Sequence, residues 1–211
     1  MDPERRHFVL RKLHSLSGVF PIGVFLLEHF YTNSYSIKGP ELFNEKVVAL
    51  NALPYLYVIE IGFIGLPLLF HAVLGMLISF ERKRSPGSLG YSRTWFYAFQ
   101  RYTGIFLALY IGVHVYLTRF SGTPPDQLFE HMASYLSNPA MMAFYVLGVL
   151  AASFHFGNGL WGFLIHWGIT VTPRAQRLSS WVCMGTAVIL GFAGVNSLFG
   201  FLHTPIGFLN R

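Results

Sequence analysis

Long apolar runs separated by short polar clusters dominate the pattern along the 211 residues. A helix needs about 20 mostly apolar residues to cross the hydrocarbon core of a bilayer. Five runs approach or exceed this length, at residues 13–35, 55–80, 102–120, 141–169 and 179–202. Proline, glycine and charged residues fill the segments between them, which is typical of turns. The pattern therefore predicts an all-α membrane protein, with residues 1–211 forming one domain of five transmembrane helices.

The composition narrows the functional class. Hydrophobic residues make up 53% of the chain and charged residues only 11%, whereas soluble domains carry about 25% charged residues. The single cysteine, Cys183, excludes an internal disulfide and a cysteine-based metal cluster. The net charge of +6 is not gathered on one face, so we expect no nucleic-acid partner. The segments between the runs are too short to hold a separate catalytic domain.

Basic residues favour one side of the predicted bundle, which is expected to be cytoplasmic. That side carries the following residues: Arg5, Arg6, Arg11, Lys12, Arg82, Lys83, Arg84, Arg93, Arg101, Arg174 and Arg177. The opposite side carries only the following: Lys38, Lys46, Arg119 and Arg211. The chain is therefore expected to begin in the cytoplasm and to end outside.

Four of the nine histidines lie well inside the first four predicted helices, one on each. Ionisable side chains are costly in a bilayer and usually have a function there. Because successive helices alternate in direction, a rise of 1.5 Å per residue puts His29 and His114 roughly 20–25 Å from the cytoplasmic edge. The same arithmetic puts His71 and His155 roughly 25 Å from the outer edge. The histidines thus form an outer pair and an inner pair.

Two histidines at one depth on facing helices suit a b-type haem, whose iron takes one imidazole from each side. A zinc site would instead bring three or four ligands to one point. Gly75 and Gly159 follow His71 and His155 by one helical turn and would leave room for a wide macrocycle, although glycines also serve helix packing. Two haems are the favoured interpretation. Interhelical hydrogen bonds and a proton-conducting histidine chain are the alternatives.

Other polar residues near the membrane are candidates for supporting roles. Glu28, beside His29, and Glu60, near the outer end of the second helix, could supply protons to a quinone, or could simply be interfacial carboxylates. Haem propionates are anionic and need donors. Four residues at the cytoplasmic ends of helices one and three are candidates for that role: His14, Ser17, Gln100 and Arg101.

Ordered motifs on four helices carry a resemblance to a known family. They are residues 11–16 (RKLHSL) and 28–29 (EH), residues 66–72 (LPLLFHA), residues 100–101 (QR) with Gly104, and residues 154–161 (FHFGNGLW) with 167–174 (WGITVTPR). Together they resemble the di-haem cytochrome b membrane-anchor subunit of succinate dehydrogenase and fumarate reductase, of the Bacillus type. The resemblance covers roughly residues 5–180, and the fifth helix shares only its apolar character.

This resemblance implies that His29, His71, His114 and His155 are the axial ligands of two b haems. It also implies a flavoprotein subunit with FAD and an iron–sulfur subunit on the cytoplasmic face of a bacterial cell membrane. Such complexes pass electrons between succinate or fumarate and a membrane quinone, commonly menaquinone. The direction of the reaction, the quinone and a trimer of complexes are left open.

The chain departs from the family at one position, and two other classes of membrane protein are alternatives to it. Some di-haem fumarate reductases have a glutamate two positions before the fourth-helix ligand, where this chain has Ser153. A cytochrome b of another respiratory enzyme, such as nitrate reductase, would usually have its N-terminus outside, against the basic residues here. A histidine-relay proton transporter should show an internal repeat, and none is visible in the sequence.

Overall fold

The computed structural model describes residues 2–81 and 92–206, and within these ranges it contains helices and no strands. The residues Arg82, Lys83, Arg84 and Arg211, on which part of the orientation argument depends, lie outside them. In chain order the elements are α1 (Pro3–Val19), α2 (Ile22–Ser34), η1 (Tyr35–Lys38), α3 (Pro40–Asn51), α4 (Leu56–Val58), η2 (Ile59–Gly65), α5 (Leu66–Glu81), α6 (Ser92–Thr118), η3 (Pro125–Gln127), α7 (Leu128–Leu136), α8 (Pro139–His166) and α9 (Pro173–Gly200). The all-helical class expected from the apolar runs is confirmed.

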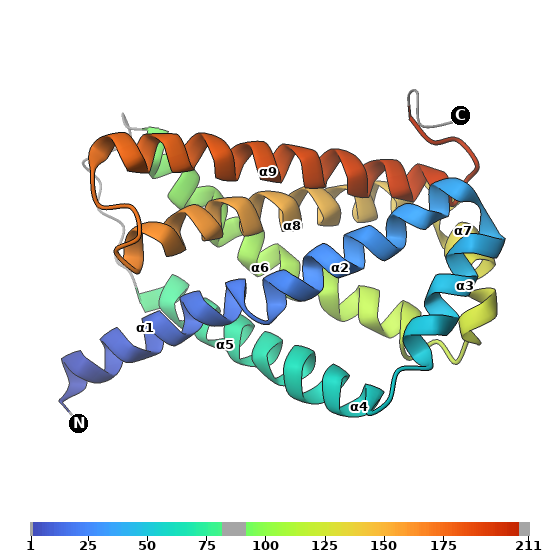
Figure 1. Ribbon diagram of the computed structural model, residues 1–211, viewed down its shortest axis with the longest axis horizontal. Coiled ribbons are helices and arrows are strands. Elements are labelled where there is room, and N and C mark those ends of the chain that lie inside the picture. Colours follow the sequence, from blue (N-terminus) through green and yellow to red (C-terminus); the bar gives the residue numbers. More distant parts are fainter. Residues whose placement is uncertain (1, 82–91, 207–211) are drawn as a thin grey trace.

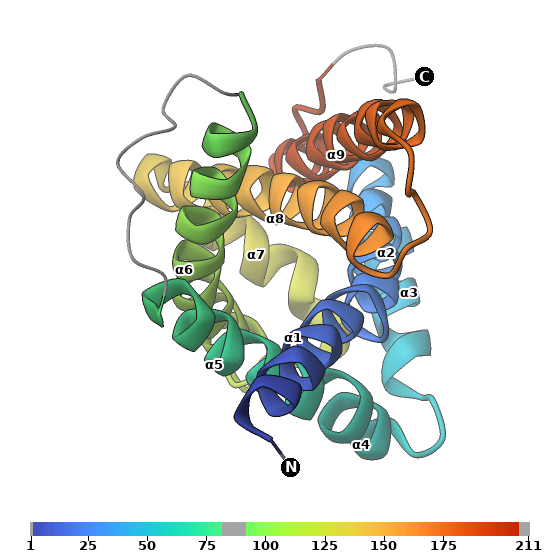
Figure 2. The same ribbon diagram turned by 90° about the vertical axis from the view of Figure 1, so that its left-hand side faces the viewer.

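Four long helical segments surround a common axis. Figure 2 looks along this axis and shows α1 followed by α2, then α5, α6 and α8, as a ring. Contacts link α1 to α5, α5 to α6, α6 to α8, and α8 back to α1. Helix α9 lies outside the ring and packs along α8 and α2 (Figure 1). Consequently α5 faces α8 across the ring, and α2 faces α6.

Within the described residues, four helical segments are long and apolar enough to cross a bilayer. They are Pro3–Lys38, Leu56–Phe80, Pro139–His166 and Pro173–Gly200. The fifth expected span, 102–120, lies almost entirely within α6, which has 27 residues but is not among these four segments. Polar residues such as Gln100, Arg101 and His114 interrupt its apolar stretch.

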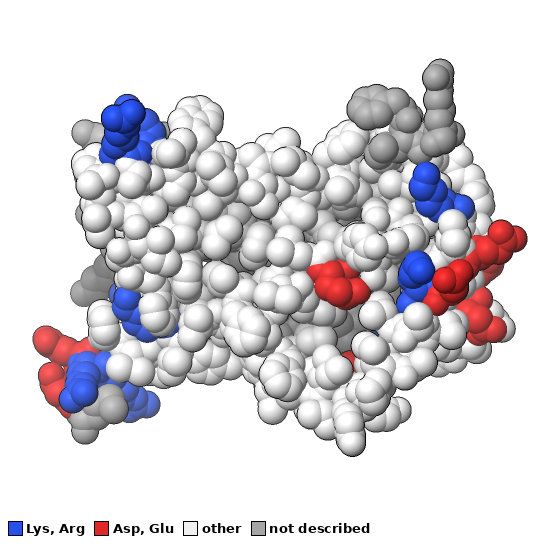
Figure 3. Space-filling view, in the orientation of Figure 1, with Lys and Arg blue, Asp and Glu red and all other residues white. Residues whose placement is uncertain are grey.

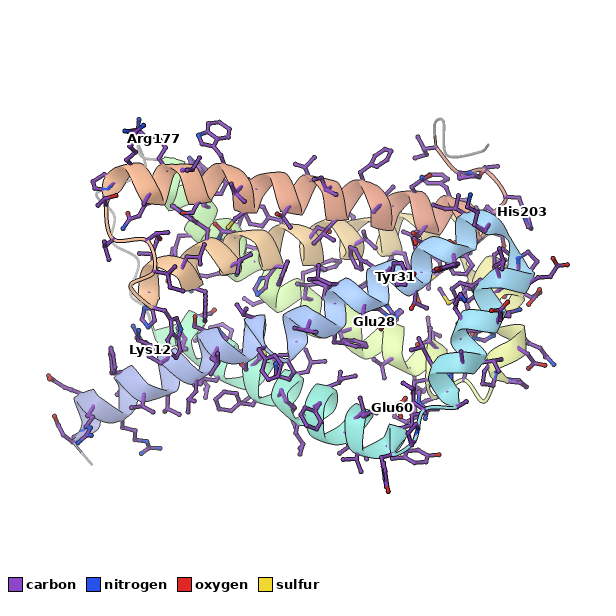
Figure 4. All side chains as sticks on the ribbon, viewed as in Figure 1. Lys12, Glu28, Tyr31, Glu60, Arg177 and His203 are labelled. Carbon is purple, nitrogen blue, oxygen red and sulfur yellow. The ribbon has the colours of Figure 1, made fainter. Side chains whose placement is uncertain are left out.

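Charged side chains gather at the two ends of the molecule and leave its middle largely uncharged on the face that Figure 3 shows. Lys12, near the start of the first long segment, and Arg177, near the start of α9, mark the same end in Figure 4. We call this the amino-terminal end. An uncharged middle between two charged ends is the distribution expected of a protein that crosses a bilayer.

Two short helices, α3 and α7, close the opposite end of the bundle (Figure 1), and the sequence had indicated only connecting segments there. We call this the capped end. Phe43 and Phe129 pack edge to face there, and each is only 2% exposed. The Asn44 side chain accepts a hydrogen bond from the backbone N–H of Phe129 at 3.0 Å and donates one to Glu130. The capped end is therefore a packed hydrophobic cluster and not a flexible connection.

Capping side chains next to the first turn determine where the last two long helices, α8 and α9, begin. The Asn138 side-chain oxygen accepts hydrogen bonds from the two backbone N–H groups that follow Pro139, at 2.9 and 3.3 Å. Thr172 plays the same part before Pro173, by accepting from the backbone of Ala175 at 3.2 Å. These side chains satisfy N–H groups that have no partner inside a helix, and proline fits the first helical position. The starts at Pro139 and Pro173 therefore precede the predicted apolar runs by two and six residues.

Candidate functional site

The histidine pair nearer the amino-terminal end, which we call the proximal pair, consists of His71 on α5 and His155 on α8. These helices face each other across the ring, and the two imidazole centroids are 6.2 Å apart with their planes at 80°. When two imidazoles bind one metal ion from opposite sides, the distance between their ring centroids has two contributions. These are the two metal–nitrogen bonds of about 2 Å each and, in each ring, the distance from the nitrogen to the centroid, and together they amount to about 6 Å. The spacing of the proximal pair therefore fits one metal between the rings.

Hydrogen bonds fix the ring of His71 against α1. Its Nδ1 lies 3.0 Å from the backbone oxygen of His14 and 3.2 Å from the hydroxyl oxygen of Ser17. A carbonyl oxygen can only accept, so Nδ1 carries the proton and donates it. The Ser17 hydroxyl in turn donates to the His14 oxygen at 2.9 Å.

Residues of α6 hold His155 in a similar way. The hydroxyl oxygen of Thr103 lies 3.1 Å from His155 Nδ1. The Gln100 amide nitrogen donates to the His155 backbone oxygen at 3.1 Å, and Asn158 donates to the Gln100 side-chain oxygen at 2.8 Å. Partners on the second ring nitrogen orient a metal-binding histidine and set its tautomer. Thr103 was not among the candidates expected from the sequence, and Asn158 was included there only as part of the motif at residues 154–161.

Two glycines that were not among the candidates from the sequence, Gly18 and Gly104, let these rings approach the neighbouring helices. A Cβ at Gly18 would meet His71 Cε1 at 2.6 Å, and a Cβ at Gly104 would meet His155 Cε1 at 3.0 Å. By contrast, Gly75 approaches the ring of His14 and Gly159 approaches the Gln100 amide. Gly75 and Gly159 thus lie against packed side chains, as in the alternative interpretation, and the expectation that they leave room for a macrocycle stays a prediction. The recurring dipeptides Ser17–Gly18 and Thr103–Gly104 were the signal available in the sequence.

The histidine pair nearer the capped end, which we call the distal pair, consists of His29 on α2 and His114 on α6. Their ring centroids are 5.6 Å apart at 78°, slightly closer than in the proximal pair. Tyr110 stacks on His114 at 5.9 Å, and Tyr145 meets it edge to face at 5.8 Å. Nδ1 of His114 is buried and has no hydrogen-bond partner among the described residues. The distal pair thus has an aromatic setting with few polar partners.

The two pairs lie at different levels of the bundle. Thr103, which contacts His155, and His114 are eleven residues apart on α6, which corresponds to about 16 Å along a helix. No group of three or more histidine, cysteine or acidic residues that could hold a metal is found in the described part of the chain. The structure therefore brings together the same two pairs that the depth argument selects. Their role as iron ligands stays a prediction.

The four candidates for propionate binding all lie near the proximal pair, but their hydrogen bonds differ. The His14 ring stacks on His71 at a centroid distance of 4.1 Å. Arg101 donates to the backbone oxygen of Ser79 and thereby links α6 to α5. Ser17 and Gln100 are engaged with the histidines themselves. The single proton of the Ser17 hydroxyl goes to a backbone oxygen, which places Ser17 to support His71. The propionate role of all four residues stays a prediction.

The two carboxylates considered for quinone chemistry lie in different surroundings (Figure 4). Glu28 accepts a hydrogen bond from Thr32 at 2.6 Å. An acidic side chain interrupts the uncharged middle of the face in Figure 3, at the place that Figure 4 labels Glu28. Glu60 accepts two hydrogen bonds of 2.9 Å from Arg119. Glu60 is therefore part of an ion pair that links η2 to the end of α6.

Ser153, two positions before His155 on α8, is 2% exposed. Its hydroxyl donates to the backbone oxygen of Val149, one turn earlier in α8, at 2.8 Å. Cys183, also 2% exposed, is a free thiol on α9. Ser153 lies against Gly191 of α9, and the backbone oxygen of Cys183 lies against Gly157 of α8.

Comparison with known proteins gives consistent results. The family model described as succinate dehydrogenase/fumarate reductase transmembrane subunit matches residues 78–194, which include His114 and His155. The chain is 43% identical over 198 residues to the succinate dehydrogenase cytochrome b558 subunit of Bacillus subtilis, covering 93% of this chain and 98% of that protein. It is 34% identical over 61 residues to the succinate dehydrogenase hydrophobic membrane anchor subunit of Thermoplasma acidophilum, covering 29% of this chain and 50% of that protein.

Proposed function

The chain belongs to the family of succinate dehydrogenase/fumarate reductase transmembrane subunits, and from this premise we propose that it is the membrane-anchor cytochrome b of a succinate:quinone oxidoreductase. It is a multi-pass protein of a bacterial cell membrane. The observation that carries the proposal is the pair His71 and His155, whose rings are 6.2 Å apart and nearly perpendicular on opposite helices. The first relative is named as a cytochrome b, which agrees with haem as the bound group.

Two b haems are proposed, one held by His71 and His155 and the other by His29 and His114. When bound, they supply one-electron transfer between an iron–sulfur partner subunit and a membrane quinone. The residues fit such groups, because both pairs come from opposite helices and Gly18 and Gly104 keep the proximal rings close to the neighbouring backbone. His14 and Arg101 are the proposed propionate partners of the proximal haem, since both lie beside α5 at that level.

The proposed complex places its soluble subunits at the amino-terminal end, on the cytoplasmic side. Lys12 and Arg177 mark this end, and cytoplasmic segments are enriched in basic residues. The partners would be a flavoprotein subunit with FAD and an iron–sulfur subunit. We also propose that α6 crosses the membrane as a fifth span, because its 27 residues correspond to about 40 Å of helix.

A quinone, proposed to be menaquinone, would be reduced near the distal pair. Its reduction takes up protons, and Glu28 is the carboxylate best placed to supply them. Glu28 adjoins His29 in α2, and its recorded hydrogen bond is to the hydroxyl of Thr32, whereas Glu60 is already bonded to Arg119. Glu28 is therefore preferred over Glu60.

A reduced-minus-oxidised spectrum with a pyridine haemochrome count tests the proposal. We expect two b haems per chain in the wild type, and one in the variants His71→Ala and His155→Ala, because each loses one ligand of the proximal haem. A histidine-relay transporter would be colourless. A wild-type preparation without haem would exclude the proposal, and two normal haems in either variant would exclude the pairing.

A further inference from the structure

We propose that Ser17–Gly18 on α1 and Thr103–Gly104 on α6 form two equivalent seats, each of which holds one imidazole of the proximal pair with its proton on Nδ1. In each seat the hydroxyl accepts the Nδ1 proton and the glycine leaves room for Cε1. The inference rests on the proposed haem ligation and adds the residues that position the ligands. We call these two dipeptides the hydroxyl–glycine seats.

The direction of the hydrogen bonds around Thr103 determines which ring nitrogen of His155 carries the proton. A threonine hydroxyl has one proton to donate, and the Thr103 oxygen lies 2.7 Å from the backbone oxygen of Phe99 and 3.2 Å from that of Gln100. Both of these atoms can only accept, so the Thr103 proton points to the backbone. The contact of 3.1 Å between Thr103 and His155 Nδ1 is then a hydrogen bond in which the imidazole donates. A neutral imidazole protonated on Nδ1 has its lone pair on Nε2, where a metal binds.

The same reasoning applies to His71 in the other seat. The Ser17 hydroxyl donates to the His14 backbone oxygen at 2.9 Å, which leaves a lone pair for the Nδ1 of His71 at 3.2 Å. The His14 backbone oxygen, 3.0 Å from the same Nδ1, is a second acceptor. His71 is therefore also protonated on Nδ1 and presents Nε2 as the ligand atom.

The glycine of each seat sets how closely the ring can approach the helix. A Cβ at Gly18 would lie 2.6 Å from His71 Cε1, and one at Gly104 would lie 3.0 Å from His155 Cε1. Both distances are shorter than ordinary van der Waals contacts. Any larger residue would push the ring away from its hydroxyl acceptor, so hydroxyl and glycine act together.

The distal pair provides an internal comparison. His114 Nδ1 is buried without a partner among the residues described here. Near His29 the contact is with the Asn33 amide nitrogen, at 3.4 Å from Nε2, and an amide nitrogen donates and does not accept. The hydroxyl–glycine arrangement is thus specific to the proximal pair, although all four histidines lie in the same bundle.

The seats have an electronic consequence. An acceptor on Nδ1–H makes the imidazole a stronger ligand, and a stronger ligand favours ferric over ferrous iron. Removal of one acceptor should therefore shift the midpoint potential of the proximal haem to more positive values. It should also weaken haem retention, by about 10- to 100-fold if haem follows other metal sites that lose such a partner. The distal haem should keep its potential.

The first experiment is a redox titration of the assembled complex in membranes carrying Thr103→Val. Valine keeps the shape of threonine and removes the acceptor. The proximal haem is identified as the one that is lost in His155→Ala. We expect a positive shift of that haem alone, restoration by Thr103→Ser, and no shift in Thr186→Val, a control in which the hydroxyl bonds only to its own helix, at Val182.

The second experiment changes the space in the seat and leaves its hydroxyl intact. Gly104→Ala should alter the low-spin ferric EPR signal of the proximal haem, which reports the angle between the two imidazole planes. Gly112→Ala on the same helix is the matched control, because no described atom beyond the adjoining turns of its own helix lies within 4 Å of the added Cβ. The expected result is a changed signal in the first variant and a wild-type signal in the second.

The outcomes separate this inference from the proposed function. A wild-type complex without haem overturns the proposed function. A Thr103→Val complex with two haems and wild-type potentials overturns the seats and leaves the proposed function intact. An equal shift of both haems, or a shift that Thr103→Ser does not restore, also overturns the seats, because the effect would then be general and not due to the hydroxyl.

Discussion

At the scale of single residues, Glu28 and Glu60 show how two carboxylates of similar depth differ in their availability. Arg119 approaches Glu60 with two nitrogens at 2.9 Å. The recorded partner of Glu28 is the neutral hydroxyl of Thr32, and a neutral partner leaves the carboxylate free to exchange protons. A charged group at membrane depth usually has a function, and the surroundings favour Glu28 for that function.

Glu28→Gln is expected to slow quinone reduction and to spare the haems. Glutamine keeps the size of the side chain but cannot transfer a proton, and loss of a general acid commonly costs 10²- to 10⁴-fold in rate. The measurement is succinate:quinone reductase activity, compared with succinate-dependent reduction of a soluble dye that accepts electrons from the partner subunits.

Glu60→Gln is the matched comparison for this prediction. It removes one charge of a partly exposed ion pair, which is worth about 0.2–1 kcal/mol, so quinone reduction should fall far less. If Glu60→Gln lost quinone reduction and Glu28→Gln kept it, the proton donor would be Glu60.

At the scale of elements, the two short helices that connect the long ones, α3 and α7, form a packed cluster at the capped end. Phe43 of α3, Phe129 of α7 and Phe201 after α9 pack ring against ring at centroid distances of 4.9–5.9 Å. Ser36 in η1 donates to the Ser197 backbone oxygen at 2.7 Å. This cluster fixes the ends of α2 and α9, and α2 carries His29 of the distal pair.

Asn44→Ala is expected to destabilise the capped end. The variant leaves the backbone N–H of Phe129 buried without its acceptor, which costs about 1–3 kcal/mol. The measurement is thermal unfolding of the detergent-solubilised complex, followed by loss of the haem absorbance. We expect a lower midpoint with a normal haem count at low temperature.

Asn51→Ala is the control for this prediction, because its amide bonds to Val47 within the same helix and the residue is exposed. Its midpoint should stay close to that of the wild type. Equal destabilisation by both substitutions would show that the bond between Asn44 and Phe129 has no special role.

The elements also show where prediction from sequence succeeded. Long apolar runs indicated the segments Leu56–Phe80, Pro139–His166 and Pro173–Gly200, because the bilayer imposes a minimum length on any span. The helices α3 and α7 were not expected, since each is short and carries polar residues. The packing of Phe43 against Phe129 and the hydrogen bond from the Phe129 backbone to Asn44 stabilise them, and these contacts join segments more than 80 residues apart in sequence.

At the scale of the whole molecule, the proposed orientation and the number of spans make one joint prediction. If α6 crosses the membrane, Gln127 and the N-terminus lie on opposite sides of it. If α6 does not cross, Gln127 and the N-terminus lie on the same side. Cys183 is 2% exposed, and its replacement gives a cysteine-free background.

Single cysteines in a Cys183→Ser background test this prediction with a membrane-impermeant maleimide. Gln127→Cys should be labelled in intact cells, because Gln127 is exposed near the capped end. His7→Cys, on the exposed first turns of α1, should be labelled only after the cells are permeabilised. Labelling of both positions in intact cells, or of neither, would contradict the proposed fifth span.

The sequence by itself determined the helical class, the membrane location, the family resemblance and the two histidine pairs. The resemblance rests on motifs in four helices. The other three follow from one-dimensional quantities: the length of apolar runs, the position of basic residues and the rise per residue along a helix. Depth alone is enough to pair His71 with His155 and His29 with His114, because the bilayer aligns the helices.

The tertiary structure alone decided what surrounds each histidine. The rotation of a helix about its axis depends on packing with its neighbours, and a sequence periodicity does not fix which neighbour a side chain meets. For that reason Ser17 and Thr103 were found as acceptors for the proximal rings, and Gly75 and Gly159 were found against His14 and Gln100. The depth of each histidine in the membrane follows from the sequence, whereas the packing between helices determines which hydrogen bonds orient its ring.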